Sequence, residues 1–280
     1  MFQYAAGLAL ALDHGQTLKL DIGGYIDYHL HHGFELQNVF NCTADIATVH
    51  DVRVLIGWQS LPLVMRLLSQ PCMNILRSSA LIVEPHFNYW SGIGSVPGNC
   101  YLYGYWQSHK YFDKHTSELR KEFTFQPPLN DKNQEIASQI LTSHAVSLHV
   151  RRCDYQTNPK NIHLYHVCTL DYYRSAIDYI SNSIDRPVFI VFSDDMDWVK
   201  ENLHIDGPTQ YIDHNRGSDS FNDMRLMSLC QHHIIANSTF SWWGAWLNAD
   251  PDKTVVAPRQ WFKNCRMNSI DLIPNNWILI

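Results

Sequence analysis

The feature that most constrains the fold is a regular alternation of two kinds of segment in the second half of the chain. Short apolar segments of the type that forms buried parallel strands alternate with segments whose apolar residues recur at helical spacing. The strand segments are 145–150, 187–192, 209–212, 232–236 and 254–257, and the helical segments are 170–181, 196–203, 219–230 and 240–248. Five strands alternating with four helices predict an α/β fold built on a doubly wound parallel sheet.

Polar residues follow each of these predicted strands. They are Arg151 with Arg152, residues 193–195, residues 213–216, residues 237–241, and Pro258 with Arg259. The carboxyl ends of parallel strands meet at one edge of a sheet, and doubly wound proteins bind their ligands at that edge. The sequence therefore predicts a shared ligand site there.

The first half of the chain has weaker patterns. A helical pattern begins at Phe2, strand candidates occupy 17–22, 81–83 and 101–106, and residues 126–130 have the composition of a linker. We expect two Rossmann-like domains facing each other across a cleft, one from residue 1 to 128 and the other from 129 to 280.

Composition excludes several classes of protein. A net charge of −6 argues against a general nucleic-acid binder, which would present a basic face. No apolar run approaches the roughly 18 residues that span a bilayer, and the segment 5–12 lacks the flanks of a secretory signal. Seven cysteines without a C-x-x-C pair indicate free thiols in a reducing compartment. We therefore expect a cytoplasmic protein.

Two adjacent arginines, Arg151 and Arg152, follow the first of these strands. Guanidinium groups at the end of a buried strand need an anionic partner, because burying an unpaired charge is unfavourable. A phosphate, which arginine can bind through two parallel hydrogen bonds, is one partner. Salt bridges to Asp154 and to a second acid are the alternative.

The acidic sequence Ser193-Asp194-Asp195 ends the second strand. A carboxylate there can accept hydrogen bonds from a ribose or a guanine edge, or it can simply cap the next helix. The spacing Asp195-Met196-Asp197 also matches the D-x-D of metal-dependent glycosyltransferases. Asp197, however, would lie inside a helix and face away, and the two arginines already supply positive charge. We expect no metal.

The segment Asn237-Ser238-Thr239-Phe240-Ser241 joins a strand to a helix. Hydroxyl groups and free backbone N–H groups at a helix N-terminus form an anion site, although one hydroxyl is explained by capping alone. The tryptophans that follow are expected in the core. The sixteen histidines include His29, His31, His32, His232 and His233, and none of their spacings matches a full zinc ligand set.

Taken together, these residues resemble the galactoside α-1,2-fucosyltransferases of glycosyltransferase family 11. The matching segments are MFQYAAGLA at 1–9, YLYGYWQSHKYF at 101–112, SLHVRRCDY at 147–155, VFSDDMDWV at 191–199, HHIIANSTFSWWGAWLN at 232–248 and TVVAPRQWF at 254–262. The resemblance implies a GT-B-like pair of domains, GDP-fucose as donor, inversion at the anomeric carbon and no metal cofactor.

The resemblance also implies roles for individual residues. Arg151 would neutralise the leaving β-phosphate, and Asp154 would act as the base or brace the arginines. The donor would be held by His149 and Asp194 or Asp195 at the guanosine, by Ser238 and Thr239 at the diphosphate, and by Arg152, Ser193, Asn237, Phe240 and Ser241. The acceptor would face Tyr105, Trp106, Gln107 and Ser108.

The expected reaction is transfer of L-fucose to the 2-hydroxyl of a terminal galactoside in surface-glycan biosynthesis, with peripheral membrane association through a lipid-linked acceptor. The alternatives are a degenerate relative that binds nucleotide or glycan without turnover, and a fucosyltransferase of different linkage. Two departures from the family pattern bear on this: Cys153 stands where relatives carry glycine, and the chain starts at the helix that follows the family's first strand and G-G-L-G-N-Q turn. We expect that strand to be absent.

Overall fold

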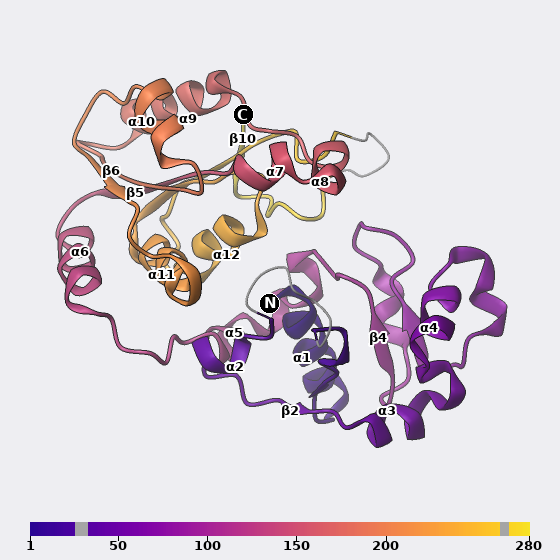
Figure 1. The fold of residues 1–280 in the computed structure, drawn as a ribbon. Helices are drawn as coiled ribbons and strands as arrows, with labels where there is room; N and C mark the ends of the chain where they lie inside the picture. The colour runs from indigo at the N-terminus through magenta and orange to yellow at the C-terminus, as the bar shows by residue number, and fades with distance from the viewer. Residues whose placement is uncertain (26–32, 264–268) are drawn as a thin grey trace. The chain divides into compact units, whose positions relative to one another are not determined.

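The computed structural model describes residues 1–25, 33–263 and 269–280 (Figure 1). The expected histidine positions 29, 31 and 32 lie outside these residues. The chain divides into two compact units, one of residues 1–126 and 270–272, the other of residues 127–269 and 273–280.

The second unit is built on a six-stranded parallel sheet in the order β10-β9-β8-β5-β6-β7. The strands are β5 Ala145–Val150, β6 Val188–Ser193, β7 Thr209–Ile212, β8 His232–Ile234, β9 Val255–Ala257 and β10 Ile278–Leu279. The doubly wound sheet is confirmed, and five strands lie where the sequence predicts them. The sixth, β10, has two residues, too few for a periodic pattern.

The strand order is that of the Rossmann fold, and it fixes where a ligand can bind. From β5 the chain proceeds outward through β6 and β7, then returns to place β8 on the other side of β5. Val146 of β5 pairs with Phe189 of β6 and with His232 of β8. Strand order thus reverses between β5 and β8, and the crevice beyond the carboxyl ends of strands at such a switch point is the usual ligand site.

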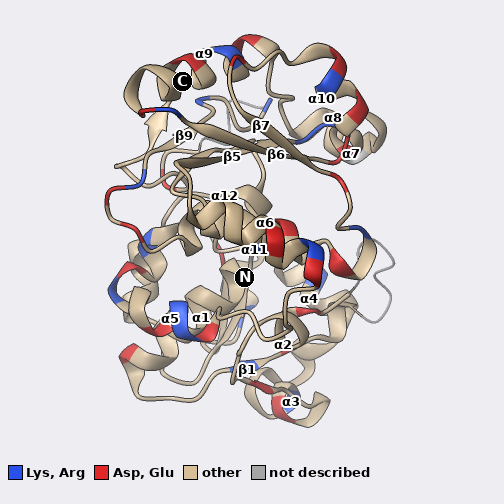
Figure 2. Cartoon of the chain, turned by 90° about the vertical axis from the view of Figure 1, so that its left-hand side faces the viewer, with Lys and Arg blue, Asp and Glu red and all other residues tan. Residues whose placement is uncertain are grey.

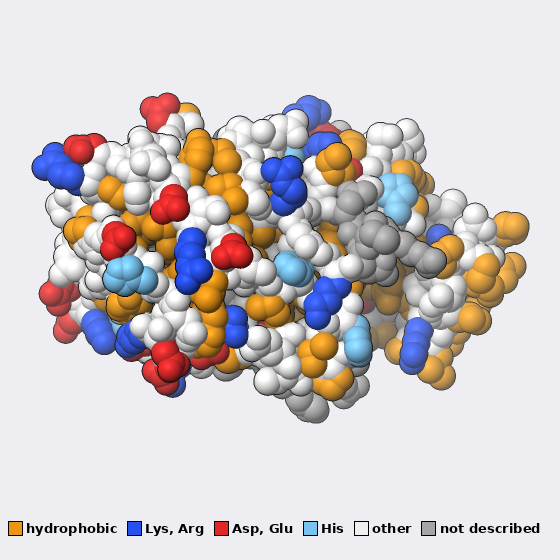
Figure 3. Space-filling model, turned by 90° about the horizontal axis from the view of Figure 1, so that it is seen from above, with side chains coloured by type: hydrophobic (Ala, Val, Ile, Leu, Met, Phe, Trp, Pro, Cys, Tyr) orange, Lys and Arg blue, Asp and Glu red, His pale blue; other side chains and the backbone are white. Residues whose placement is uncertain are grey.

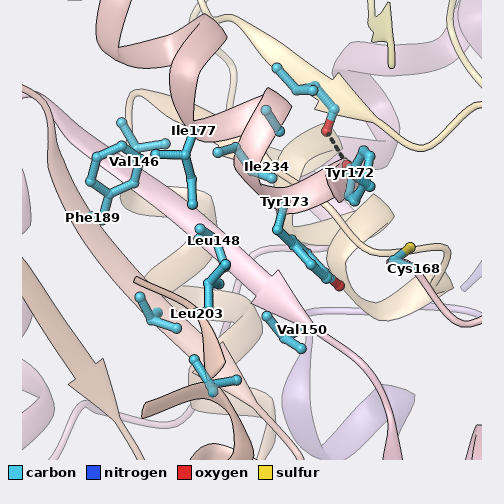
Figure 4. Packing of buried hydrophobic residues seen from close by; sticks show 14 of the residues in the cluster. Val146, Leu148, Val150, Cys168, Tyr172, Tyr173, Ile177, Phe189, Leu203 and Ile234 are labelled. Carbon is cyan, nitrogen blue, oxygen red and sulfur yellow. Dashed lines mark hydrogen bonds between the residues drawn. The ribbon is translucent and has the colours of Figure 1, made fainter. Parts of the chain in front are cut away.

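Helices cover both faces of this sheet, α9 (Leu170–Ser183) and α10 (Met196–Asn202) on one face and α6 (Asp131–Leu141), α11 (Phe221–Leu229) and α12 (Thr239–Leu247) on the other (Figure 1). Adjacent residues of β6 serve opposite faces, so Phe189 packs in the cluster under α9 while Ile190 packs in the cluster under α6 and α11. Figure 4 shows the first cluster, where Ile177 and Tyr173 of α9 lie over β5. Burial on both faces explains why β6 is apolar from Val188 to Phe192.

Helix α12 carries no charged residue, as its single colour in Figure 2 shows. Trp242, Trp243 and Trp246 are all buried, and the rings of Trp242 and Trp277 lie 5.5 Å apart. The tryptophans therefore belong to the core, as predicted.

The first unit contains two small parallel sheets. Its elements are α1 Phe2–His14, β1 Lys19–Leu20, η1 Gly23–Tyr25, α2 Leu36–Val39, β2 Asp45–Ile46, α3 Val49–Ile56, η2 Gly57–Ser60, α4 Pro62–Leu68, η3 Pro71–Leu76, β3 Leu81–Val83, η4 Ser91–Ser95, β4 Tyr101–Tyr103, η5 His109–Tyr111, η6 Asp113–His115 and α5 Thr116–Glu122. Strand β1 pairs with β2, and β3 pairs with β4. The short helices α7 Cys153–Thr157 and α8 Pro159–Leu164, and the turn η7 Gly217–Asp219, belong to the second unit.

Two predicted strands of the first unit are shorter than expected, and β4 shows why. The backbone N–H groups of Tyr105 and Trp106 donate to the Glu84 carboxylate, at 2.7 and 3.0 Å. They therefore do not form strand hydrogen bonds with β3. Gly104 allows this approach, since a Cβ there would lie 2.4 Å from Glu84 Cβ. Strand β4 therefore ends at Tyr103, and β1 is reduced to two residues.

Among the described residues, no helix combines the length and the apolar character needed to cross a bilayer. The six described cysteines are all free.

Candidate functional site

The carboxylate of Asp194 holds the turn that follows β5. Its Oδ1 accepts a hydrogen bond of 2.9 Å from the backbone N–H of Arg152, and its Oδ2 accepts one of 3.0 Å from that of Cys153. The Cys153 thiol donates to the Asp194 carbonyl at 3.1 Å. The ends of two neighbouring strands are thus joined, and the backbone that carries the arginines is fixed.

Arg151 lies between two carboxylates. Its Nε donates to Asp154 Oδ1 at 2.8 Å and lies 3.4 Å from Asp194 Oδ2, while Asp154 Oδ2 accepts from Asn161 at 3.0 Å. Burial lowers the pKa of Arg151, but the Asp194 and Asp154 carboxylates outweigh it and the net pKa is raised. Burial likewise raises the pKa of Asp194, partly offset by Arg151. The salt bridges that the sequence allowed as an alternative are therefore formed. Both are made by Nε, so the two Nη groups of Arg151 can still donate to a further anion.

Arg152 is held by an aromatic ring. Its guanidinium carbon lies 3.5 Å from the centroid of the Trp198 ring, and its Nε lies 3.7 Å from Asp195 Oδ2. That Nε is buried and has no hydrogen-bond partner within the described parts of the chain. A planar cation stacked on an indole keeps its N–H donors at the edge of the stack, where they can reach an anion.

His149, on β5, is 5% exposed. Burial and the positive charge of Arg151 lower the pKa of His149 to about 3, so the imidazole is neutral at physiological pH. Its Nδ1 is buried without a hydrogen-bond partner in the described residues, and its ring lies 5.9 Å from that of Phe240 on α12. A neutral imidazole offers one donor and one acceptor at the switch point.

The segment before α12 divides into two groups of residues. Asn237 and Ser241 are buried and are hydrogen-bonded to the protein: Asn237 Nδ2 donates to the carbonyls of His166 and Trp261, at 2.5 and 2.8 Å, and Ser241 Oγ donates to the Ser238 carbonyl at 3.3 Å. Ser238 caps the helix, its Oγ accepting from the Phe240 N–H at 3.3 Å. Thr239 and Phe240 are partly exposed at the start of the helix.

At the end of β6, the hydrogen bonds are those of a helix cap. Ser193 Oγ accepts from the Asp195 N–H at 2.9 Å, and Asp195 accepts from the Trp198 N–H at 3.4 Å. Asp197 lies inside α10, as expected. Asp195 therefore has both the capping role that the sequence allowed and a contact with Arg152.

The structure thus brings together His149, Arg151, Arg152, Asp154, Asp194, Asp195 and Phe240. Two members of this site were not recognised in the sequence, Trp198 and Asn161. Trp198 could have been found from its place three residues after Asp195, the predicted helix cap. The second has no local signal, because only the fold of α7 and α8 brings it to Asp154.

The predicted acceptor residues belong to the first unit. The Tyr105 side chain is 69% exposed, whereas Trp106 and Ser108 are buried, and Ser108 Oγ donates to the Asp271 carbonyl at 2.5 Å. Trp106 has φ of 55°, a left-handed conformation that its N–H bond to Glu84 helps to hold. Gln107 is half-buried. Of these four residues, Tyr105 presents its ring most fully to solvent.

A buried polar cluster that was not predicted follows β7. Asn133 and Asn215 exchange hydrogen bonds through their side-chain amides, at 2.8 and 3.1 Å, and Asn215 also donates to Asp223 Oδ1 at 2.8 Å. His214 Nε2 donates to Asn133 Oδ1 at 3.0 Å. Burial raises the pKa of Asp223 to about 7, although the bond from Asn215 opposes this.

The strand order and the cluster at its switch point define a protein of the GT-B-like α/β class. A solved structure with this fold is the NodZ α-1,6-fucosyltransferase soaked with GDP-fucose, which matches with a TM-score of 0.51 over 88% of this chain and 87% of that one. The sequences are 13% identical, so the likeness concerns the fold alone.

The chain belongs to glycosyl transferase family 11, whose family model matches residues 79–280. An α-1,2-colitosyltransferase from Escherichia coli is 33% identical over all of this chain and 94% of its own length. The E. coli O-antigen biosynthesis glycosyltransferase WbnK is 40% identical over 65% of this chain and 60% of that protein. The human galactoside α-(1,2)-fucosyltransferase 1 is 30% identical over 52% of this chain and 42% of that protein. The family resemblance seen in the sequence is thereby confirmed, and the chain is a glycosyltransferase.

Proposed function

We propose that this glycosyltransferase transfers L-fucose from GDP-β-L-fucose to the 2-hydroxyl of a terminal galactoside, with inversion at the anomeric carbon. Family membership supports sugar transfer. Two relatives, in E. coli and in human, are named for α-1,2 transfer, and the human relative is named for fucose and a galactoside.

The observation that carries the proposal is the pair of arginines at the switch point of the sheet. In the proposed reaction the bond between fucose C1 and the β-phosphate oxygen breaks as the acceptor oxygen attacks from the opposite face. Negative charge then develops on the departing GDP. Arg151, kept charged by Asp154 and Asp194, and Arg152, stacked on Trp198, stabilise that charge.

The remaining donor contacts follow from the positions around this pair. The N-terminus of α12, with Ser238 and Thr239, adds backbone N–H groups and a favourable dipole for the diphosphate. Neutral His149, with an unpartnered nitrogen beside Phe240, contacts the guanosine. Ser193 and Asp195 lie at the adjacent strand end, while Asp194, Asn237 and Ser241 hold the backbone of the site.

Two roles are open to Asp154. As a base it would take the proton of the galactose 2-hydroxyl. As a brace it would orient Arg151, and its present contacts favour this role, because one oxygen accepts from Arg151 and the other from Asn161. On the acceptor side, the exposed ring of Tyr105 can stack on a sugar face, with Trp106, Gln107 and Ser108 shaping the backbone around it.

A second donor is favoured by one observation. The relative that matches this chain from end to end is named a colitosyltransferase. Colitose is the 3-deoxy form of L-fucose, so the leaving group and the charge requirements are the same for both sugars. The choice between them depends on contacts to the 3-hydroxyl.

The test is release of GDP by the purified chain, with GDP-fucose and GDP-colitose offered separately against lactose, in the presence and absence of EDTA. We expect turnover of GDP-fucose that EDTA does not abolish, because the arginines supply the charge that a metal would bring. Turnover of GDP-colitose alone would replace the fucose assignment. GDP binding without turnover of either donor would indicate a binding protein, and loss with EDTA reversed by Mn²⁺ would refute the arginine mechanism.

A further inference from the structure

The first unit exposes an unusual concentration of apolar side chains. Of the seventeen large apolar side chains that are exposed among the described residues, eight lie in the 28-residue segment from 49 to 76. They are Val49, Val54, Trp58, Leu61, Leu63, Leu67, Ile75 and Leu76, and we refer to them as the 49–76 surface. In Figure 3 hydrophobic side chains gather at the right-hand end, where α4 lies in Figure 1.

Helix α4 shows why these side chains are exposed. Six of its seven residues are apolar, so both of its sides are apolar, but only one side packs inward. Met65 and Leu68 are buried in a cluster with Ile56 of α3, while Leu63 and Leu67 are 83% and 55% exposed. Burial of the core therefore does not account for the apolar character of the outer side.

A buried glutamine ties together two of the elements that carry these side chains. Gln59 of η2 donates to the Leu76 carbonyl at 3.1 Å and accepts from the Ser78 N–H at 2.9 Å. This places Trp58, the neighbour of Gln59, beside the end of η3. Arg77 then donates to the Leu68 carbonyl at 2.8 Å and ties the same end to α4.

The unpaired charges on this segment are those of two arginines. Arg53 and Arg66 are exposed, and neither has an ion-pair partner in the described parts of the chain. The single acid of the segment, Asp51, is already neutralised by Lys19 at 2.9 Å and caps α3 with Thr48. The surface is therefore apolar and cationic in a protein whose net charge is −6.

We propose that the 49–76 surface docks the protein on a bilayer of anionic lipid. An exposed tryptophan is suited to the level of the lipid headgroups, leucine and isoleucine side chains to the acyl boundary, and arginines to the lipid phosphates. The rest of the acidic chain is repelled by such a membrane, so the local cationic surface also sets the orientation. The proposal goes beyond the chemistry of the donor site, and its route differs from the lipid-linked acceptor expected from the sequence.

A second copy of the chain fits this surface less well. In a two-fold dimer the same surface faces itself, so Arg53 and Arg66 would be desolvated near their own copies without a carboxylate to pair with. Lipid phosphates, in contrast, supply the missing anions.

The experiment is flotation of the full chain with vesicles of equal parts phosphatidylglycerol and phosphatidylcholine, compared with phosphatidylcholine alone. The wild type should float with the anionic vesicles. The double variant Leu63→Ser/Leu67→Ser should reduce the partition coefficient at least tenfold. Arg53→Gln/Arg66→Gln should reduce it about 25-fold on anionic vesicles only, since each arginine near such a surface contributes about fivefold. Leu141→Ser, an exposed leucine of α6, is the matched control and should bind as wild type.

Quenching by brominated lipid gives a readout that does not depend on the folding of the serine variants. Wild-type fluorescence should be quenched by brominated anionic vesicles, and Trp58→Phe should remove most of that quenching while keeping flotation. Transfer to soluble lactose should be unchanged in all these variants, which separates the docking surface from the proposed reaction. Failure of the wild type to float, flotation that neither double variant reduces, or a solution dimer that Leu63→Ser/Leu67→Ser abolishes would overturn the proposal.

Discussion

The Asp194 carboxylate accepts the backbone N–H of Arg152 at 2.9 Å, across the gap between the ends of β6 and β5. A side chain of one strand end thus fixes the backbone that carries the arginines of the next. Asp194→Ala should leave the N–H groups of Arg152 and Cys153 without this acceptor and lower the free energy of unfolding by about 1–3 kcal/mol. It should also weaken GDP binding, because Arg151 loses one of its two carboxylates.

Chemical denaturation and calorimetric titration with GDP measure these two effects. Asp206→Ala changes a carboxylate whose side chain is 94% exposed and serves as the control. If Asp194→Ala matched the control in both measurements, the bracing role would be wrong.

Arg151 is expected to act on the leaving group. Arg151→Ala should reduce kcat roughly 10²-fold, by analogy with the removal of one transition-state donor. Arg151→Lys should recover part of the rate, since an ammonium keeps the charge but lacks the planar fork. The control is Arg174→Ala, which removes an arginine whose side chain is 59% exposed on α9. Steady-state rates of GDP release within threefold of wild type for Arg151→Ala would exclude the role.

Asp154→Asn distinguishes the base from the brace. An amide cannot take up the proton of the galactose hydroxyl, and it carries no negative charge to pair with Arg151. If Asp154 is the base, kcat should fall strongly while GDP affinity stays nearly unchanged. If Asp154 orients Arg151, GDP affinity should fall in parallel with kcat. The contacts of Asp154 with Arg151 and Asn161 lead us to expect the parallel loss. Titration with GDP beside GDP-release kinetics decides between the two.

Asp223 should make stability depend on pH. Its folded pKa of about 7 lies above the ordinary value of 3.8, so the folded chain holds the proton more tightly than the unfolded chain. Asp223 therefore contributes less to the free energy of unfolding as pH rises from about 4 to about 7, by up to about 1.4 kcal/mol per pH unit. Above pH 7 its contribution no longer changes.

Asp223→Asn keeps an oxygen that can accept from Asn215 and removes the titration. Relative to wild type, this variant should gain stability steadily between pH 4 and pH 7 in denaturation experiments. Asp252→Asn, at an exposed residue, controls for the general effect of removing a carboxylate. A stability difference between Asp223→Asn and wild type that does not change with pH would contradict the burial argument.

The second unit could be predicted from the sequence because its central strands, β5 and β6, are buried on both faces. The run that forms β6 supplies Phe189 to one face and Ile190 to the other, so every position must be apolar and the pattern is unambiguous. The position of Arg151 and Arg152 at a strand end follows from the same pattern. Strand β10, with two residues, offered no such run.

Long-range hydrogen bonds explain what could not be predicted. The sequence predicts a donor contact for Asn237 from its place beside a helix start; in the structure its amide donates to the carbonyls of His166 and Trp261, residues far away in the sequence. The contact between Arg152 and Trp198 likewise depends on how α10 packs against β6. Helix α6 is not among the predicted helices; it begins directly after the predicted linker, where Asn130 caps it by accepting from the Asn133 N–H.

The proposed reaction is tested by the linkage of the product formed from GDP-β-L-fucose and lactose. Nuclear magnetic resonance should show a single trisaccharide with an α-fucosyl residue on O2 of the galactose. The wild type should form this product, and Arg151→Ala should form it about 10²-fold more slowly. A β-linked product, fucose on any other hydroxyl, or the same product formed equally well without Arg151 would contradict the proposal.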